Sequence, residues 1–178
     1  MASITQAERT LILKTPLGAD VLLLLGFSGT ESLSRLFSYQ LDLASANDAI
    51  AAKNIVGKPV TWSITRFDKN PRYFSGIVSR LVTGPVNRRR LRTYRAEVVP
   101  WPWLLTRTTD CRIFQNLSTP DIITTIFKDF GFNDYALELQ GSFPKREYCV
   151  QYRETAFNFI SRLMEHEGIF FFFRHEDG

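Results

Sequence analysis

The stretch from Arg146 to Gly178 constrains the fold of this chain more than any other part of the sequence. From Tyr148 to Arg153, the residues Tyr, Val and Tyr alternate with Cys, Gln and Arg, which is the period-two pattern of a β-strand. Apolar residues then recur at helical spacing from Ala156 to Met164, and Gly168 supplies the left-handed conformation in which helices commonly end. Ile169 to Phe173 follow as an uninterrupted apolar run. This order predicts a strand, a helix and a second strand buried on both faces.

The part of the chain up to Val99 has the pattern of β-strands joined by turns. We expect strands over residues 10–15, 20–27, 37–43 and 60–64, and in the two arms of a long hairpin, residues 72–83 and 91–99. Residues 28–31 are expected to break the second strand, and residues 46–52 to form a loop or a short helix. About six strands with little helix predict a small β-barrel or sandwich.

The character of the sequence changes at Pro100. Trp101 to Leu105 predicts a short helical or irregular connector packed by its two indole side chains. Ser118 to Asp121 predicts a helix start, because it combines a hydroxyl cap, an early proline and an acid near the positive end of the helix. This helix is expected to carry an apolar stripe and to end at Gly131, and residues 136–139 are expected to form a short strand.

These patterns together predict a mainly β chain with an α+β second part. We expect a small β-barrel domain over residues 1–105 and an α+β domain over residues 106–178. The chain stops directly after the last expected strand, where a natural domain could finish or a fragment could equally have been cut at the next turn.

The composition is that of a folded globular protein rather than a disordered chain, with 44% hydrophobic and 22% charged residues. Its two cysteines are isolated, which fits a reducing compartment better than a disulfide scaffold. The N-terminus lacks a basic segment followed by an apolar core, so we expect no signal peptide. The apolar runs are too short to cross a bilayer, so we expect synthesis and folding in the cytoplasm.

No metal-binding, cofactor-binding or catalytic constellation is recognisable in the sequence. His166 and Glu167 begin like the helical motif of zinc proteases, but Phe170 stands where the second histidine is required. We therefore interpret His166 as a residue at a helix C-terminus, where the helix dipole favours it. No enzymatic activity and no cofactor are expected.

The two cysteines give no catalytic site either. Cys111 lies beside Arg112, which could lower the pKa of a thiol, but no candidate base accompanies the pair. Cys149 falls on a predicted strand and is interpreted as a small buried apolar residue.

Five arginines between residues 88 and 95 form the only basic cluster: Arg88, Arg89, Arg90, Arg92 and Arg95. The cluster could contact phosphate or an acidic partner. The other interpretation is a solvated hairpin tip whose charges limit aggregation at the sheet edge, and it is favoured because aromatic residues are sparse there and no nucleic-acid motif accompanies the cluster. The Phe170–Phe173 run and the Trp101/Trp103 pair could be core or interface, and core is favoured for most of them.

Several motifs in the same order resemble the N-terminal hub region of VgrG proteins, the spike proteins of bacterial type VI secretion systems. They are GFSGTE at residues 26–31, RYFSGIV at 72–78, PWPWLL at 100–105, CRIFQ at 111–115, EYCVQYRET at 147–155 and FISRLMEHEGIFFFFRHEDG at 159–178. The VgrG hub is in turn similar to the baseplate hub of contractile phage tails.

The resemblance implies a small β-barrel followed by an α+β domain of the phage-baseplate-hub type, and it implies that this second domain is truncated at its C-terminal end, because the family continues into the rest of the hub. It also implies a homotrimer that forms a pseudo-six-fold collar on the hexameric Hcp tube, since a trimer can cap a hexamer if each subunit presents two similar surfaces. Baseplate proteins are further implied partners, and effectors would be carried by C-terminal parts absent here. The resemblance implies assembly in the bacterial cytoplasm followed by export through the contractile machine, with no nucleic-acid partner and no membrane insertion by this fragment.

Three alternatives remain open. The first keeps the fold and assigns the chain to the hub of a contractile phage or phage-like particle. The second is a small hydrolase effector, which lacks a visible acid/base or nucleophile pair. The third is a nucleic-acid-binding module resting on the basic cluster, which would bind with a steep salt dependence.

Overall fold

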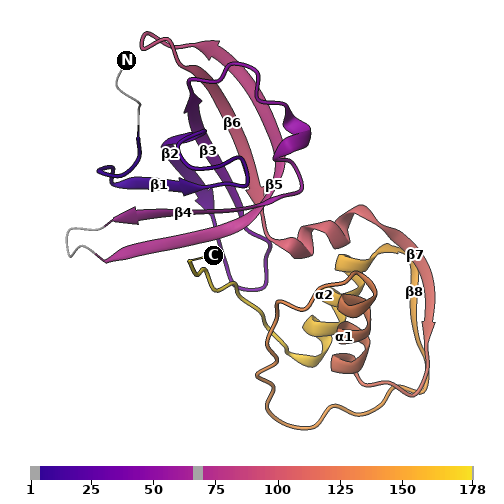
Figure 1. The fold of residues 1–178 in the computed structure, drawn as a ribbon. Coiled ribbons are helices and arrows are strands. Elements are labelled where there is room, and N and C mark those ends of the chain that lie inside the picture. The colour runs from indigo at the N-terminus through magenta and orange to yellow at the C-terminus, as the bar shows by residue number, and fades with distance from the viewer. Residues whose placement is uncertain (1–4, 66–69, 178) are drawn as a thin grey trace. The chain divides into compact units, whose positions relative to one another are not determined.

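A computed structural model describes residues 5–65 and 70–177, and these residues form two compact units (Figure 1). The first unit comprises the described residues up to Trp101 together with those from Phe173 onward. The second unit runs from Pro102 to Phe172. The described residues from Phe173 onward, which the sequence pattern assigns to the second domain, pack instead on the first unit.

The first unit is built on one antiparallel sheet in the order β1-β4-β5-β6-β3-β2, which curls around its core as an open half-barrel (Figure 1). Its strands are β1 (Leu11–Lys14), β2 (Leu23–Thr30), β3 (Ser38–Ser45), β4 (Pro59–Thr65), β5 (Pro71–Val86) and β6 (Arg92–Val99), with the short 3-10 helix η1 (Ala52–Asn54) between β3 and β4. The predicted mainly β fold is confirmed, including the long β5–β6 hairpin.

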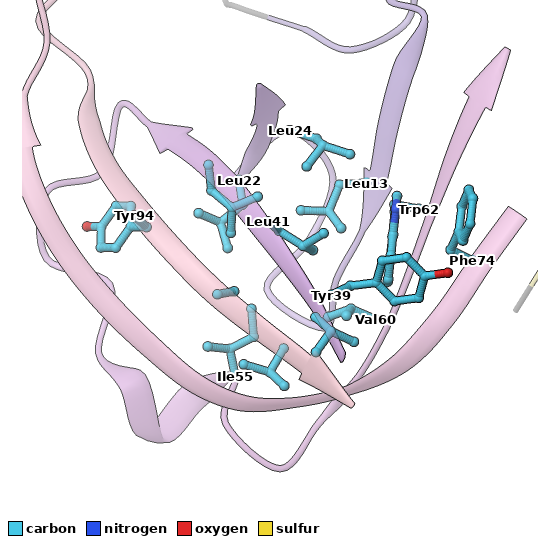
Figure 2. Close-up of a cluster of buried hydrophobic side chains, with 14 of the residues drawn as sticks. Leu13, Leu22, Leu24, Tyr39, Leu41, Ile55, Val60, Trp62, Phe74 and Tyr94 are labelled. Carbon is cyan, nitrogen blue, oxygen red and sulfur yellow. The ribbon is translucent and has the colours of Figure 1, made fainter. Parts of the chain in front are cut away.

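The core of this sheet follows directly from alternation along its strands. In β3, Tyr39, Leu41 and Leu43 are buried. Gln40 and Asp42, which lie between them, are exposed, as the sequence pattern predicted. Figure 2 shows Tyr39, Leu41 and Trp62 among the buried side chains contributed by several strands. Burial of each large apolar side chain stabilises the fold by about 1.5–3 kcal/mol, so this layer dominates the stability of the unit.

The predicted break at residues 28–31 is wrong, because β2 continues to Thr30. Gly29 pairs with Tyr39 and Thr30 pairs with Ser38, so backbone hydrogen bonds to β3 extend the strand through the polar residues. The start of the strand was also misplaced. Asp20 has a positive φ of 60° and lies in a turn, and the strand begins at Leu23.

The second unit combines a two-stranded antiparallel sheet with two helices. Its elements are η2 (Trp101–Arg107), β7 (Thr109–Phe114), α1 (Thr119–Asp129), β8 (Cys149–Thr155) and α2 (Ala156–Glu167). The predicted start of α1 is confirmed by a capping box, in which Ser118 accepts from the backbone of Asp121 and the Asp121 carboxylate accepts from the backbone of Ser118. The second helix, α2, ends as predicted at Gly168, which has a φ of +69°. Within the described residues no helix is long and apolar enough to cross a membrane.

Two predicted strands are absent. Residues 169–173 form no strand, and Phe170 and Phe172 are 62% and 54% exposed. Residues 136–139 are likewise irregular, and Leu137 and Leu139 are exposed. An apolar run becomes a strand only where another strand offers backbone donors and acceptors, and no described strand pairs with either segment.

Candidate interaction surfaces

The β7–β8 ribbon has one covered face and one open face. Its inner face is buried at Phe114, Cys149 and Gln151. Its outer face exposes large side chains, with Ile113 60% and Tyr152 63% exposed. The strand pairing sets Ile113 opposite Val150 and Cys111 opposite Tyr152, so these residues share the outer face. We call Cys111, Ile113, Tyr148, Val150 and Tyr152 the ribbon face.

The ribbon face has the composition of a protein contact surface rather than of a solvated sheet. Apolar and aromatic residues gather on it, and the Arg153 guanidinium lies 5.3 Å from the ring centre of Tyr152. Aromatic residues and arginine are enriched at protein interfaces. The alternation predicted for β8 is confirmed, but the sequence pattern does not determine which of the two faces is open.

The basic cluster divides into two groups in the structure. Arg88, Arg89 and Arg90 are exposed at the tip of the β5–β6 hairpin. By contrast, Arg92 donates to the backbone oxygen of Gly84 at 3.2 Å, and Arg95 forms a surface ion pair with Asp42 at 3.0 Å.

The backbone of the hairpin tip is fixed without help from the arginine side chains. The side-chain oxygen of Asn87 accepts hydrogen bonds from the backbone of Arg89 and Leu91, at 2.9 and 3.0 Å. Tyr94, the only aromatic residue among the arginines, is buried, and its hydroxyl donates to the backbone oxygen of Asn47. No aromatic side chain of the cluster is therefore available to stack on a base.

A third surface lies where residues 173–177 meet the sheet of the first unit. Five aromatic residues of the first unit pack together, and we call them the aromatic cluster: Phe27, Phe37, Tyr39, Trp62 and Phe74. Trp62 and Phe74 stack with their ring centres 5.4 Å apart, and Tyr39 lies at the same distance from Phe74 (Figure 2). Phe173 adds a T-shaped contact to Phe37 at 5.0 Å.

His175 is held in this surface by specific polar contacts. Its ring lies 5.1 Å from Phe37 and 5.6 Å from Phe74, and its side chain is only 9% exposed. The backbone N–H of Ser75 donates to Nδ1 of His175 at 3.0 Å. On the other side of the ring, Nε2 lies 3.4 Å from Oε2 of Glu31.

Glu31 also binds Tyr39. The Tyr39 hydroxyl donates to Oε2 of Glu31 at 3.0 Å, and burial, followed by this hydrogen bond, raises the pKa of Tyr39 to about 12. A hollow of about 440 Å³ opens beside this network and is lined by Glu31, His175, Phe173 and residues 70–73. The sequence pattern did not predict this position of His175 beside Glu31 and Ser75. The one available signal was a histidine directly after an aromatic run.

His166 stands at the C-terminal end of α2, as predicted, and is 72% exposed. One of its ring nitrogens lies 3.0 Å from the Arg146 guanidinium. Arg146 also binds the Glu167 carboxylate at 2.6 Å, and this hydrogen bond holds the pKa of Glu167 below its usual range. The described part of the chain contains no group of three or more His, Cys, Asp or Glu side chains placed to hold a metal ion.

Cys149 is buried, as predicted, whereas Cys111 is exposed. Trp101 and Trp103 are both half-buried, so neither is a fully enclosed core residue.

The profile of one protein family, described as the phage tail baseplate hub (GPD), matches residues 30–178, which is most of the chain. The chain belongs to this family.

Curated relatives agree with this assignment. The type VI secretion system spike protein VgrG1a of Pseudomonas aeruginosa is 48% identical over 96% of this chain, and VgrG1c of the same bacterium is 47% identical over 97%. The spike protein VgrG3 of Vibrio cholerae is 35% identical over 88%. The matched chain spans 26%, 24% and 16% of the length of these three relatives. The resemblance to VgrG spike proteins predicted from the sequence is confirmed.

A solved structure shows the same fold. The c3393 protein of E. coli superposes with a TM-score of 0.78 and 25% identity, over 92% of this chain and 45% of that chain. It is described as a component of the type VI secretion system with structural similarity to the T4 bacteriophage tail proteins gp27 and gp5.

Proposed function

We propose that this chain is the N-terminal hub segment of a VgrG-type spike and that it acts as a structural component rather than as an enzyme. In this role it connects the spike to the Hcp tube, so that contraction of the machine delivers effectors. One observation carries the proposal. Three spike proteins of one bacterium are 46–48% identical to it over 96–98% of its length. The protein assembles in the bacterial cytoplasm and is then exported with the spike.

The oligomer that fits this role is a homotrimer. A three-fold hub meets a six-fold tube ring without mismatch only if each subunit offers two similar surfaces, and this half-barrel supplies one of them. Effectors and baseplate proteins are partners of the whole spike, and this chain spans about a quarter of the length of its P. aeruginosa relatives.

Within the hub, the ribbon face is the surface we assign to contact with another part of the assembly. Ile113, Tyr148 and Tyr152 are each more than half exposed here, although Ile113 and Tyr152 lie on paired strands and Tyr148 directly precedes β8. Exposure of such an apolar sheet face to water is unfavourable. Burying it against a partner lowers the free energy by about 25 cal/mol per Å² of apolar surface.

A chimeric spike tests the function. The matched region of P. aeruginosa VgrG1a is replaced by this chain, and Hcp released into the medium is measured in a strain whose own VgrG proteins have been deleted. Release comparable to that of native VgrG1a supports the hub function. A chimera that is stable in the cell but releases no Hcp contradicts it.

Light scattering of the 178-residue chain over a concentration series locates the trimer interface. A trimer means that the interface lies within these residues. A monomer means that the trimer interface lies in other parts of the spike. In that case the hub function is tested by the chimera alone.

A second candidate is the hub of a contractile phage or phage-like particle. The family description and the stated likeness of c3393 to T4 tail proteins favour it. Neighbouring genes separate the two functions, because secretion-sheath genes accompany a spike and capsid genes accompany a phage tail.

A further inference from the structure

Strand β8 contains one residue more than β7, the strand beside it (Figure 1). Asp110 pairs with Glu154, and the next pair joins Cys111 to Tyr152. Arg153, between these two pairs, has no opposite residue and forms a β-bulge. Its φ of +50° lies in the left-handed region, where a side chain crowds the backbone and glycine is the least strained residue. The bulge therefore carries a long cationic side chain at a position that suits glycine better.

Two neighbouring side chains hold the bulge in this shape. The buried side chain of Gln151 donates from Nε2 to the backbone oxygen of Glu154 at 3.0 Å, so it spans the bulge. From α2, Arg162 donates to the backbone oxygen of Val150 at 2.7 Å and to the Glu154 carboxylate at 2.6 Å. The backbone at Arg153 is thus fixed before any partner binds, which reduces the entropy that binding has to remove.

The bulge keeps the side chain of Arg153 out of the covered face of the ribbon. Strict alternation would turn Arg153 to the same side as the buried Gln151, but with the extra residue its side chain is exposed. Its guanidinium lies over the ring of Tyr152, on the ribbon face, at 5.3 Å from the ring centre. A guanidinium held against a ring keeps N–H donors available, so a partner can still bind it.

The other arginines of the ribbon and of the helix behind it have carboxylate partners. Arg112 forms an ion pair with Asp129, and Arg162 forms one with Glu154, each at 2.6 Å. Among the residues that the structure describes, no carboxylate pairs with Arg153. The ribbon therefore presents one positive charge without a counter-ion, beside its exposed apolar side chains.

We propose that Tyr152 and Arg153 anchor the contact made by the ribbon face, and that the partner is a protein segment with an Asp or Glu side chain among apolar residues. The carboxylate binds the Arg153 guanidinium through two parallel hydrogen bonds, and the apolar residues cover Ile113 and Val150. Tyrosine and arginine are the residues that most often dominate the binding energy of such contacts. The proposal rests on the proposed function, which assigns the ribbon face to a contact, and it adds the chemistry of the partner.

Photo-crosslinking in the VgrG1a chimera tests the partner. A photoreactive benzophenone amino acid replaces Cys111, which pairs with Tyr152, and crosslinked peptides are identified by mass spectrometry after illumination of the cells. We expect a partner peptide that contains Asp or Glu next to apolar residues. Arg153→Glu should reduce this crosslink at least about tenfold, because two like charges then face each other.

Two controls define the result. The same photoreactive residue at Leu33, which is exposed on the first unit, gives the background. Arg153→Lys keeps the charge but cannot form two parallel hydrogen bonds, so it should weaken the crosslink less than Arg153→Glu does. A crosslink that survives Arg153→Glu, a partner peptide without an acidic residue, or no crosslinked protein at all overturns the proposal. Crosslinking does not require Hcp release, so a chimera that crosslinks as expected but releases no Hcp contradicts the hub function alone.

Arg153→Gly separates a binding role from a structural one. Glycine relieves the strain at this φ, so the thermal midpoint of the chain should rise by about 1–3 °C. The crosslink in the chimera should nevertheless fall to the background, because the guanidinium is gone. A lower thermal midpoint, or a crosslink as strong as that of the unchanged chimera, shows that Arg153 is not an anchor for a partner.

Discussion

Gly29 of β2 lies directly against the ring of Tyr39 in β3. A Cβ atom at Gly29 would stand 2.2 Å from Cδ1 of Tyr39 and 2.6 Å from the backbone oxygen of Ser38. The glycine therefore allows β2 to pair closely with β3 while the Tyr39 ring joins the aromatic cluster and its hydroxyl binds Glu31.

Gly29→Ala should destabilise the first unit by about 1–3 kcal/mol, the usual cost of forcing extra atoms into a packed site. Urea unfolding followed by tryptophan fluorescence measures this change, since Trp62 lies in the same cluster. Gly26→Ala in the same strand is the control, because a Cβ atom there meets nothing within 4 Å. Equal midpoints for the two variants would show that the close contact at Gly29 is not energetically significant.

Arg146 and Glu167 should make the second unit sensitive to acid. The hydrogen bond from Arg146 lowers the pKa of Glu167, so the folded state favours the carboxylate. This stability is present above the unfolded pKa of Glu167 and is lost as the pH falls through the lower folded pKa. Arg146→Met should flatten this part of the stability curve and cost about 1 kcal/mol near neutral pH.

The measurement for this pair is thermal unfolding over a pH series on the acidic side of neutral. Arg95→Met is the control, because Arg95 and Asp42 are both more than half exposed and such surface pairs contribute little. If Arg146→Met keeps the pH profile of the unchanged chain, the hydrogen bond does not control the acid response.

The ribbon face should matter for assembly but not for folding. Tyr152→Lys in the VgrG1a chimera should abolish Hcp release, while the same change in this chain should shift unfolding by less than about 0.5 kcal/mol, because Tyr152 is 63% exposed. Leu33→Lys is the control, since Leu33 is 59% exposed on the first unit and should leave release unchanged. Normal release by the Tyr152→Lys chimera would exclude the ribbon face as a contact surface.

The two thiols should differ in reactivity. Cys111 is exposed and should react with a water-soluble thiol reagent in the native protein, whereas Cys149 is buried and should react only after unfolding. Counting modified thiols by mass spectrometry before and after adding denaturant checks this order. Rapid labelling of both cysteines in the native state would show that β8 opens readily.

The arginines at the hairpin tip should be dispensable for folding. Replacing Arg88, Arg89 and Arg90 by Ser should leave stability unchanged, because Asn87 fixes the turn with its own side chain. Fluorescence anisotropy with single- and double-stranded DNA should detect no binding even at low salt. Binding that weakens steeply as salt rises would instead favour the nucleic-acid-binding alternative.

Local patterns were sufficient to predict several elements. The alternation around Leu41 and the cap at Ser118 depend on residues within one strand or one turn, so their outcome could be read without the rest of the chain. The family resemblance was recoverable for the same reason, because its motifs are short and stand in a fixed order.

Long-range contacts decided the remainder. The run up to Phe173 has the composition of a strand, but a strand needs a partner with free donors and acceptors, and the run is not paired within either of the described sheets. The role of His175 depends on Ser75, which is 100 residues away in the sequence, and on Glu31, which is further away still. Composition and periodicity determined most strands, helices and caps, and only tertiary packing determined which faces stayed open and where residues 173–177 were bound.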